Sequence, residues 1–396
     1  MDTFGTLWAD LAPVGRYGPT GGYRRYSWTG VDAELREWFA AQCAARGLDL
    51  VEDRAGNQWA WWGDPDVTTG VVTGSHLDSV PDGGAYDGPL GVVSAFAAID
   101  ALRTDGFRPA RPVGVVHFGD EEGARFGIAC AGSRLITGTL PADRARGLTD
   151  ADGTTWAEAY ARTGRDPQQI GPDAATLGRV GAFVELHVEQ GRGLAGSGRP
   201  VGVGSRIWPH GRWRLDFAGQ ANHAGTTALD DRQDAMLGFA RTVLAAREAA
   251  ERHRVLTTLG KVTVRPNGVN AIPSAVTGWL DARGADAEAV RAAVADIEAA
   301  ADGARATTES WTDPTPFDAA LTARIAARLG DAPRLETGAG HDAGILAAAG
   351  IPSAMLFVRN PTGVSHSPVE LAEEADCRAG VAALTTVLAD LAGADR

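Results

Sequence analysis

The residues best suited to chemistry in this chain are histidines and carboxylates that stand at the ends of apolar runs. His76, Asp78 and Asp87 lie in a glycine-rich stretch, residues 74–91, directly after the apolar run 68–73. Residues two apart on a strand point to the same side, so His76 and Asp78 can touch. A histidine that binds a metal usually donates its other ring N–H to a carboxylate. Taken alone, this stretch fits a metal site and, equally well, a strand that ends in a polar turn.

More residues of the same kinds follow other apolar runs. The adjacent pair Glu121-Glu122, then His187, then His366 each stand at or after the end of such a run. Histidines with carboxylates suit zinc or a related divalent ion, and a carboxylate shared by two ions makes a two-metal site. Side chains of adjacent residues in an extended segment diverge, so one glutamate can bind metal while the other acts as a general base. A single histidine or carboxylate at such a position more often has a structural role than a metal-binding one. The recurrence of these residues at four strand ends favours metal binding.

The elements that must position these residues alternate between strand and helix. This alternation predicts an α/β fold, a mixed and largely parallel sheet flanked by helices, whose sites gather beyond the carboxyl ends of the strands. Helical spacing of apolar residues predicts helices at 31–46, 90–104, 316–329 and 370–392. Strands are predicted at 48–53, 57–62, 69–75, 113–118, 180–188 and 351–358.

A different order of elements interrupts this pattern. Four strands are predicted at 207–218, 256–264, 275–283 and 305–311. Two helices are predicted between them, at 230–252 and 286–303, so that the order is strand, helix, strand, strand, helix, strand. This is the order of a ferredoxin-like α+β domain. Because the first pattern resumes afterwards, we expect one domain from residues 1–206 and 316–396, with residues 207–315 inserted as a second domain.

Composition limits the possible partners and compartments. The 396 residues are enough for two domains, and 44% hydrophobic with 22% charged residues is typical of a soluble globular protein. A net charge of −13 argues against nucleic acid as a partner. No apolar run approaches the roughly 20 residues of a membrane helix, and no signal peptide is visible. Three scattered cysteines do not form a disulfide framework. We therefore expect a cytoplasmic protein with no membrane partner.

Seven segments together resemble the M20 metallopeptidase superfamily, and more narrowly its amidase, hydantoinase and carbamoylase branch. That branch contains N-carbamoyl-L-amino-acid hydrolases, allantoate amidohydrolases and β-ureidopropionases. The likeness runs from about residue 21 to 376, and the seven segments read GSHLDSVPDGGAYDGPLGV, GDEEGARFG, ELHVEQG, GQANHAGTT, GVNAIP, GAGHDA and GVSHSPVE. The resemblance implies a di-zinc exopeptidase-like fold and a homodimer formed through the inserted domain, which would also serve as a lid.

The resemblance further implies two divalent metal ions per subunit, zinc or else manganese, cobalt or nickel. His76, Asp87 and His187 would hold one ion, and Asp87, Glu122 and His366 the other, so that Asp87 bridges the two. It also implies a cis peptide bond after Asp87, which would aim that carboxylate.

Catalytic and substrate-binding roles follow from the same resemblance. Glu121 would be the general base, Asp78 would orient His76, and His223 would enter the partner chain's site. The residues implied to contact substrate are Gln190, His223, Asn270, Arg283 and His341. An arginine suits a substrate carboxylate, and histidine and asparagine can donate to a developing oxyanion. From the residues alone, Arg283 fits a surface ion pair as well, and Asn270 a turn.

The implied activity is hydrolysis of the linear C–N bond of a carbamoyl (ureido) group in a small acid, with release of ammonia and carbon dioxide. Two alternatives remain open: an aminopeptidase or N-acyl amino acid acylase acting on peptide or acyl amides, and a catalytically inactive binding protein. One departure from many carbamoylases is the segment Arg359–Thr362 before His366, which is expected to alter the substrate pocket.

Overall fold

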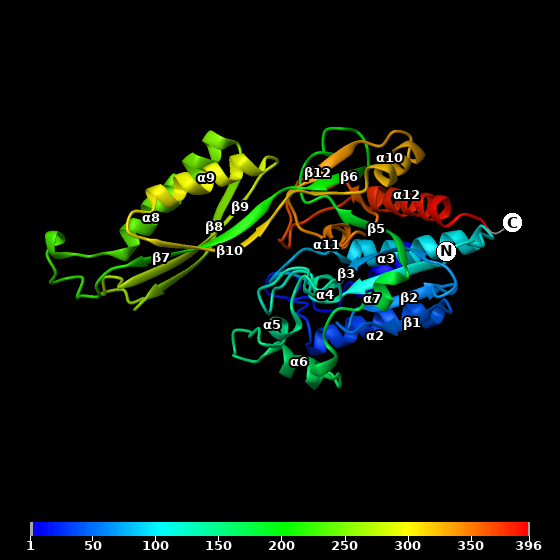
Figure 1. The fold of residues 1–396 in the computed structure, drawn as a ribbon, viewed down its shortest axis with the longest axis horizontal. Helices are drawn as coiled ribbons and strands as arrows, with labels where there is room; N and C mark the ends of the chain where they lie inside the picture. The colour runs from blue at the N-terminus through cyan, green and yellow to red at the C-terminus, as the bar shows by residue number, and fades with distance from the viewer. Residues whose placement is uncertain (1–2, 395–396) are drawn as a thin grey trace. The chain divides into compact units, whose positions relative to one another are not determined.

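The computed structural model describes residues 3–394 and arranges them in two compact units (Figure 1). The chain up to Arg206 and from Pro316 onward forms the first unit, and Ile207–Thr315 forms the second. Each unit has its own hydrophobic core and its own sheet.

The first unit is built on a nine-stranded mixed sheet. Strands β4, β3, β5 and β13 run parallel at its centre, and the pairs on either side are antiparallel. The order is β1-β2-β4-β3-β5-β13-β6-β11, with β12 beside β6. The strands are β1 Asp49–Glu52, β2 Gln58–Trp62, β3 Gly70–His76, β4 Val113–Phe118, β5 Val180–Val188, β6 Val201–Ile207, β11 Thr315–Pro316, β12 Arg334–Thr337 and β13 Ser353–Val358. This sheet confirms the predicted α/β class.

Helices flank this sheet, and α3 (Pro89–Thr104) is the one that fixes the site. It is apolar on all sides and buried against β3, β5 and α12, as expected of a helix enclosed by a core. Pro89 occupies its first turn, where a missing N–H costs nothing. The loop before α3 is therefore held at its C-terminal end by the core. The other helices are α1 Thr3–Leu11, α2 Gly30–Ala45, α4 Ala131–Ile136, α5 Ala142–Arg146, α6 Trp156–Arg162, α7 Ala174–Gly178, α10 Ala319–Arg328, α11 Asp342–Ala348 and α12 Glu374–Ala392.

Several bounds differ from the predicted ones. Helix α1 and strand β6 were not predicted, and the helix predicted at 370–392 begins only at Glu374. The residues before Glu374 form a loop instead, because their polar groups bond to the segment that precedes α3. The helix predicted at 316–329 begins at Ala319, since Pro316 belongs to β11.

The second unit is a four-stranded antiparallel sheet in the order β10-β7-β9-β8, with two helices packed on one face (Figure 1). This is the predicted ferredoxin-like arrangement. Buried residues alternate with partly exposed ones along β9, as expected of a sheet with only one covered face. The elements are β7 His210–Ala218, α8 Ala235–His253, β8 Leu256–Arg265, β9 Ala275–Arg283, α9 Ala287–Ala300 and β10 Arg305–Thr312.

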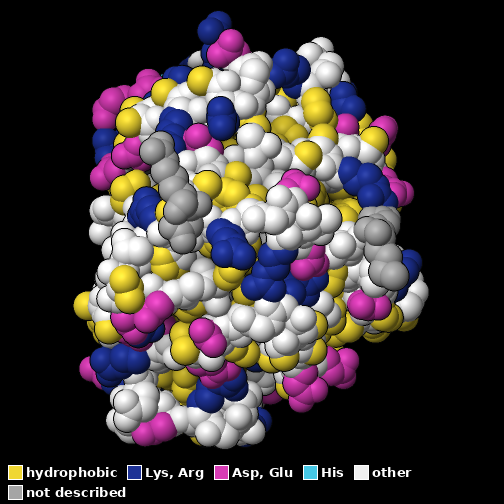
Figure 2. Space-filling view, turned by 90° about the vertical axis from the view of Figure 1, so that its right-hand side faces the viewer, with side chains coloured by type: hydrophobic (Ala, Val, Ile, Leu, Met, Phe, Trp, Pro, Cys, Tyr) yellow, Lys and Arg dark blue, Asp and Glu magenta, His cyan; other side chains and the backbone are white. Residues whose placement is uncertain are grey.

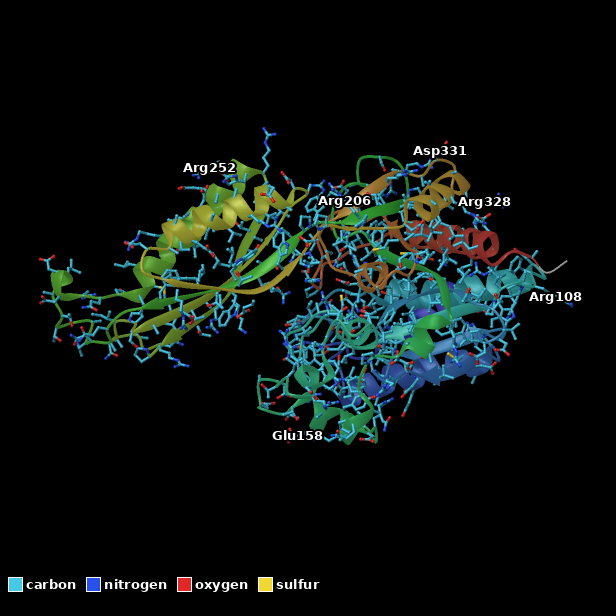
Figure 3. The ribbon with its side chains drawn as sticks, in the orientation of Figure 1. Arg108, Glu158, Arg206, Arg252, Arg328 and Asp331 are labelled. Carbon is cyan, nitrogen blue, oxygen red and sulfur yellow. The ribbon has the colours of Figure 1, made fainter. Side chains whose placement is uncertain are left out.

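Surface charges are mixed. Figure 2 shows arginine and acidic side chains interspersed on one face of the molecule. Two arginines labelled in Figure 3 make ion pairs between neighbouring helices: Arg328 with Asp390 joins α10 to α12, and Arg252 with Asp296 joins α8 to α9. Such exposed pairs contribute about 0–1 kcal/mol each, so apolar packing decides the helix positions. Among the described residues, no helix has both the length and the apolar character needed to cross a membrane.

Candidate metal centre

The candidate ligands lie together at the carboxyl ends of the parallel strands. His76 is the last residue of β3, and His187 is the last residue but one of β5. Glu121 and Glu122 follow β4, and His366 lies in the loop after β13. Since β4, β3, β5 and β13 are neighbours in this order, their ends bring all five side chains to one edge of the sheet.

Asp87 is the common member of two groups of ligands. Its Oδ1 lies 3.2 Å from Nε2 of His187 and 3.7 Å from Nε2 of His76. Its Oδ2 lies 3.3 Å from Nε2 of His366, and that nitrogen is 3.6 Å from Oε2 of Glu122. Within each group the ligand atoms lie within 4.8 Å of one another. The two groups are the two sets implied by the sequence resemblance.

The nitrogen and oxygen atoms that these side chains direct toward one another are suited to binding divalent metal ions. The Nδ1 atoms of His76 and His187 lie at hydrogen-bond distance from the main-chain oxygens of Asp78 (3.1 Å) and Val188 (2.9 Å), which leaves both Nε2 atoms toward Asp87. Oε1 of Glu122 is buried and has no hydrogen-bond partner within the described part of the chain, and Nε2 of His187 has only the 3.2 Å contact with Asp87. Buried polar atoms without partners are costly, and a bound cation would satisfy them. Nitrogen and carboxylate ligands in this combination suit zinc and its neighbours.

The electrostatics of the centre also favour a cation. Burial, together with the nearby charge of Asp87, raises the pKa of Glu122 to about 7. Burial is likewise the main cause that raises the pKa of Glu121 well above its usual value. Burial would raise the pKa of Asp87 too, but the rings of His187 and His366 hold it well below its usual range. Carboxylates crowded into a buried space in this way are typical of metal and active sites.

Asp78 contacts Glu121 and Glu122 in addition to His76, the one residue that it was expected to orient. Its carboxylate lies 3.5 Å from Nδ1 of His76, while the hydrogen-bond distance to that ring belongs to its main-chain oxygen. Its two carboxylate oxygens accept the backbone N–H groups of Glu121 (3.1 Å) and Glu122 (3.0 Å). The side chain thereby fixes the backbone of the glutamate pair as well as lying against His76.

The two glutamates point apart. Glu122 faces His366, whereas Glu121 lies with Oε2 3.9 Å from Nε2 of His76 and accepts a hydrogen bond from the Cys130 thiol on Oε1 (3.1 Å). Glu121 belongs to neither of the two ligand groups that share Asp87. Glu122 is thus placed to bind a cation together with Asp87 and His366, whereas Glu121 lies outside both groups, with Oε2 toward the His76 ring.

Gly88 permits the close approach of the Asp87 loop to His76. A Cβ atom at this position would lie 2.4–2.6 Å from three atoms of the His76 ring, and the φ angle of Gly88 is +85°. The prediction of a cis peptide bond after Asp87 is wrong. Among the described residues the cis bond is Arg265–Pro266, and the Asp87–Gly88 bond is trans. The positive φ of Gly88, which other residues rarely adopt, turns the chain here instead.

We expect Gly88→Ala to weaken metal binding by about 10- to 100-fold, as when the orientation of a ligand is disturbed. The added methyl group would displace the His76 ring from Asp87 and His187. Metal bound per chain after dialysis against a chelator measures the effect. Gly153→Ala is the matched control, because Gly153 has φ +80° and open space around it. Equal metal retention by the two variants would contradict the prediction.

Two implied substrate residues of the first unit lie at the candidate metal centre. The Gln190 amide donates to Oδ2 of Asp87 (2.8 Å) and lies 3.3 Å from Nε2 of His366. The His341 ring is 4.5 Å from that of His187, and its buried Nε2 lacks a hydrogen-bond partner within the described residues. Burial, followed by the His187 charge, lowers the pKa of His341 well below its usual value. His341 thus presents one buried ring nitrogen that has no hydrogen-bond partner among the described residues.

The three implied residues of the second unit fall into two places. The loops of His223 and Asn270 lie side by side, since Ala224 N–H donates to the Asn270 main-chain oxygen (2.9 Å) and His223 pairs with Ala271. Arg283 is the last residue of β9, whereas Asn270 precedes that strand. Nine extended residues span about 30 Å. Within one chain, Arg283 and the His223–Asn270 loops are therefore not brought together.

The segment 359–362 binds its own surroundings. Arg359 makes a two-pronged ion pair with Asp376 on α12 (2.8 and 3.0 Å). Asn360 is fully buried, and its side-chain oxygen accepts the N–H groups of Thr362 and Gly363. These side chains shape the loop that carries His366, and the expectation that they alter the substrate pocket stays a prediction.

Four residues that touch the centre were missed from the sequence. They are Cys130 on Glu121, Glu185 beneath His187, and Ser365 and Glu370 around Asp87. Ser365 and Glu370 stand in the same short segment as His366, which is the one signal that pointed to them. Glu185 lies two residues before His187 on β5, on the same side of the strand, so the spacing used for His76 and Asp78 could have found it. Cys130 lies nine residues after Glu121, and no pattern in the sequence joins the two.

Residues 72–390 match peptidase family M20/M25/M40, so the chain belongs to this family. The resemblance drawn from the sequence is confirmed. An N-carbamoyl-L-amino acid amidohydrolase of Geobacillus stearothermophilus is 38% identical over 96% of both chains. An allantoate amidohydrolase of Escherichia coli K12 is 34% identical over 94% of both chains. A solved amidase of the hydantoinase/carbamoylase family from Burkholderia vietnamiensis has a TM-score of 0.89 at 32% identity, with 99% of both chains covered.

Proposed function

We propose that this protein is a homodimeric amidohydrolase that cleaves the linear C–N bond of a carbamoyl (ureido) group with two divalent metal ions per subunit. The observation that carries the proposal is the position of Asp87, whose two oxygens face two different groups of metal-type ligands. The family match and the amidohydrolase relatives support the reaction class.

Divalent ions bound at this centre would activate water and polarise the carbamoyl oxygen. The chain's own residues move the proton. Glu121 takes it from the attacking water and delivers it to the departing nitrogen as the C–N bond breaks. The backbone of Glu121 is held by Asp78, and its Oε1 by the Cys130 thiol, so that Oε2 remains for proton transfer. Cleavage of this bond releases the substrate's amine and carbamic acid, and the carbamic acid then breaks down to carbon dioxide and ammonia.

The substrate is proposed to be a small ureido acid, such as an N-carbamoyl-L-amino acid or allantoate, as the names of the relatives suggest. Arg283 would bind its carboxylate in a two-pronged pair, and its guanidinium would have to give up the two-pronged ion pair that it makes with Asp281 (2.7 and 2.6 Å). His223 and Asn270 would donate to the developing oxyanion. Because Arg283 lies about a strand's length from those two loops, two chains would have to supply one site.

A substrate panel tests this function. Dialysed protein is loaded in turn with zinc, manganese, cobalt or nickel and given allantoate, several N-carbamoyl-L-amino acids and N-carbamoyl-β-alanine, with ammonia release measured. Dipeptides and N-acetyl amino acids are tested alongside. Metal-dependent ammonia release from a ureido acid supports the proposal. Cleavage of the dipeptides or acyl amides alone would favour the aminopeptidase or acylase alternative, and no metal-dependent hydrolysis at all would favour a binding protein.

The homodimer is supported by apolar side chains exposed on the second unit. Leu237 (57% exposed) and Leu244 (67%) lie seven residues apart on α8, hence on one face of that helix. Strand β8 is an edge strand with unpaired backbone groups, and its residues Leu256 and Val262 are exposed as well. Such edges and apolar faces are typically covered by another chain.

Replacing Leu237 and Leu244 together by Glu is expected to give a monomer, because buried like charges would face each other across a symmetric interface. Light scattering coupled to gel filtration measures the mass. The same replacement at Val67, which is exposed on the first unit, is the control. A dimer that persists in the double variant would exclude this face of α8 as the interface.

A further inference from the structure

Glu370 is a buried carboxylate outside both groups of metal-type ligands that share Asp87. It lies in the loop between His366 and α12, with 6% of its surface exposed. Its Oε2 accepts two backbone N–H groups, from Tyr86 (2.9 Å) and from Asp87 itself (3.1 Å). Its Oε1 accepts the hydroxyl of Ser365 (3.0 Å). All of these partners lie on the two loops that carry Asp87 and His366.

Ser365 links Glu370 to the side chain of Asp87 through hydrogen bonds. Its hydroxyl oxygen lies 3.2 Å from Oδ2 of Asp87 and 3.0 Å from Glu370. A hydroxyl has one proton to donate, so the two carboxylates share it. Asp87 is thus held at its backbone by Glu370 and at its carboxylate by Ser365 and Gln190.

The packing shows that this contact is specific. A Cβ atom on Gly84 would lie 2.2–2.5 Å from atoms of the Glu370 side chain, so the carboxylate reaches the loop only because residue 84 is glycine. A carboxylate buried this deeply is costly unless its oxygens are hydrogen-bonded. Here three donors bind it. A merely solvated surface glutamate would show neither the burial nor the donors.

We propose that Glu370 is a positioning residue that, together with Ser365, holds Asp87 in the orientation in which its two oxygens face different metal groups. This rests on the proposed two-metal function of Asp87. The contacts act on Oδ2, the oxygen that faces His366, and on the backbone of the loop that carries Asp87. Loss of Glu370 therefore loosens the Asp87–Glu122–His366 group most, and the other group less.

Metal binding to the full-length protein, measured without substrate, tests the proposal. Apoprotein variants Glu370→Ala, Glu370→Gln and Ser365→Ala are titrated with zinc against a chromophoric chelator, and metal content is measured by mass spectrometry. We expect Glu370→Ala to bind one of its two ions about 10- to 100-fold more weakly. Glu370→Gln should fall between it and the parent, since an amide oxygen still accepts both N–H groups. Ser365→Ala should show a smaller loss of the same kind.

The cobalt-loaded protein gives a second readout, since the visible spectrum of cobalt depends on ligand geometry. The spectrum of Glu370→Ala should change at equal cobalt occupancy. Glu373→Ala is the matched control, because Glu373 is exposed and makes no side-chain cap to α12. If Glu370→Ala does not fold, judged by the thermal melt of the apoprotein, Glu370→Gln and Ser365→Ala decide the matter.

Two results would overturn the proposal: unchanged affinity for both ions together with an unchanged cobalt spectrum, or an equal change in the Glu373 control. These outcomes are separate from the test of function. A parent protein that binds two ions but hydrolyses no ureido acid would refute the proposed function and leave the role of Glu370 standing. If the parent protein hydrolyses ureido acids but Glu370→Ala binds metal normally, the proposed function is supported and the role of Glu370 is refuted.

Discussion

Glu121→Gln is expected to lower kcat for the ureido substrate by about 10²- to 10⁴-fold, the usual contribution of a general base. Metal content should remain at the parent value. Glutamine keeps the shape of the side chain and loses the ability to take a proton. Its amide can still contact the Cys130 thiol, so the local structure should be preserved. Initial rates of ammonia release, with metal content measured on the same samples, check both parts.

The neighbouring residue supplies the contrast. Glu122→Gln should lose metal from the group formed with Asp87 and His366, because Glu122 lies 3.6 Å from the His366 ring nitrogen. Glu34→Gln, at an exposed position of α2, should change neither property. If Glu121→Gln retains parental turnover, or if it loses metal while Glu122→Gln does not, then the two assignments are wrong or exchanged.

Asp87→Asn should weaken the binding of both metal ions. The substitution preserves size but removes the charge shared by the two groups, and it leaves the His76, His187 and His366 rings around a neutral amide. Removing one partner from a buried charged arrangement costs about 3–5 kcal/mol. At 1.4 kcal/mol per tenfold change, this corresponds to about 10²- to 10⁴-fold in affinity. Zinc titration of the apoprotein measures it directly.

A matched control is available on the following helix. Asp105 ends α3 and caps it through its backbone, so Asp105→Asn should leave metal affinity unchanged. If Asp87→Asn lost only one of the two ions, Asp87 would be a ligand of a single ion and the bridging geometry would be refuted. Single-ion loss from Asp87→Asn would also remove the observation on which the proposed two-metal function rests.

The sequence was informative where one local pattern decides the structure. His76, His187 and the glutamate pair each stand at the end of an apolar strand, and parallel strands bring such ends to one edge. The second unit was predictable for a similar reason, because the order of its elements is that of a ferredoxin-like domain. The ligand roles themselves came from the resemblance and remain predictions until the variants are measured.

What could not be predicted depends on contacts between distant segments. Glu370 accepts hydrogen bonds from the N–H groups of residues 86 and 87, which lie nearly three hundred positions earlier in the chain. No local periodicity in the sequence predicts this contact. The start of α12 at Glu374 has the same cause, since the preceding residues bond to that loop. Asp78 was expected to serve His76, and its hold on the backbone of Glu121 and Glu122 requires knowing that β3 and β4 are neighbours.

The Glu370 contact also has a consequence for protein synthesis. A nascent chain that has emerged only as far as the end of the second unit already carries His76, Asp87 and His187, but it lacks His366, Ser365 and Glu370. Strand β13, which pairs with β5 at the centre of the sheet, is missing at that stage as well. The group of Asp87, Glu122 and His366 can therefore assemble only after residues 365–370 have been made. A chain made only to that point could therefore form the group of His76, Asp87 and His187 but not the group of Asp87, Glu122 and His366.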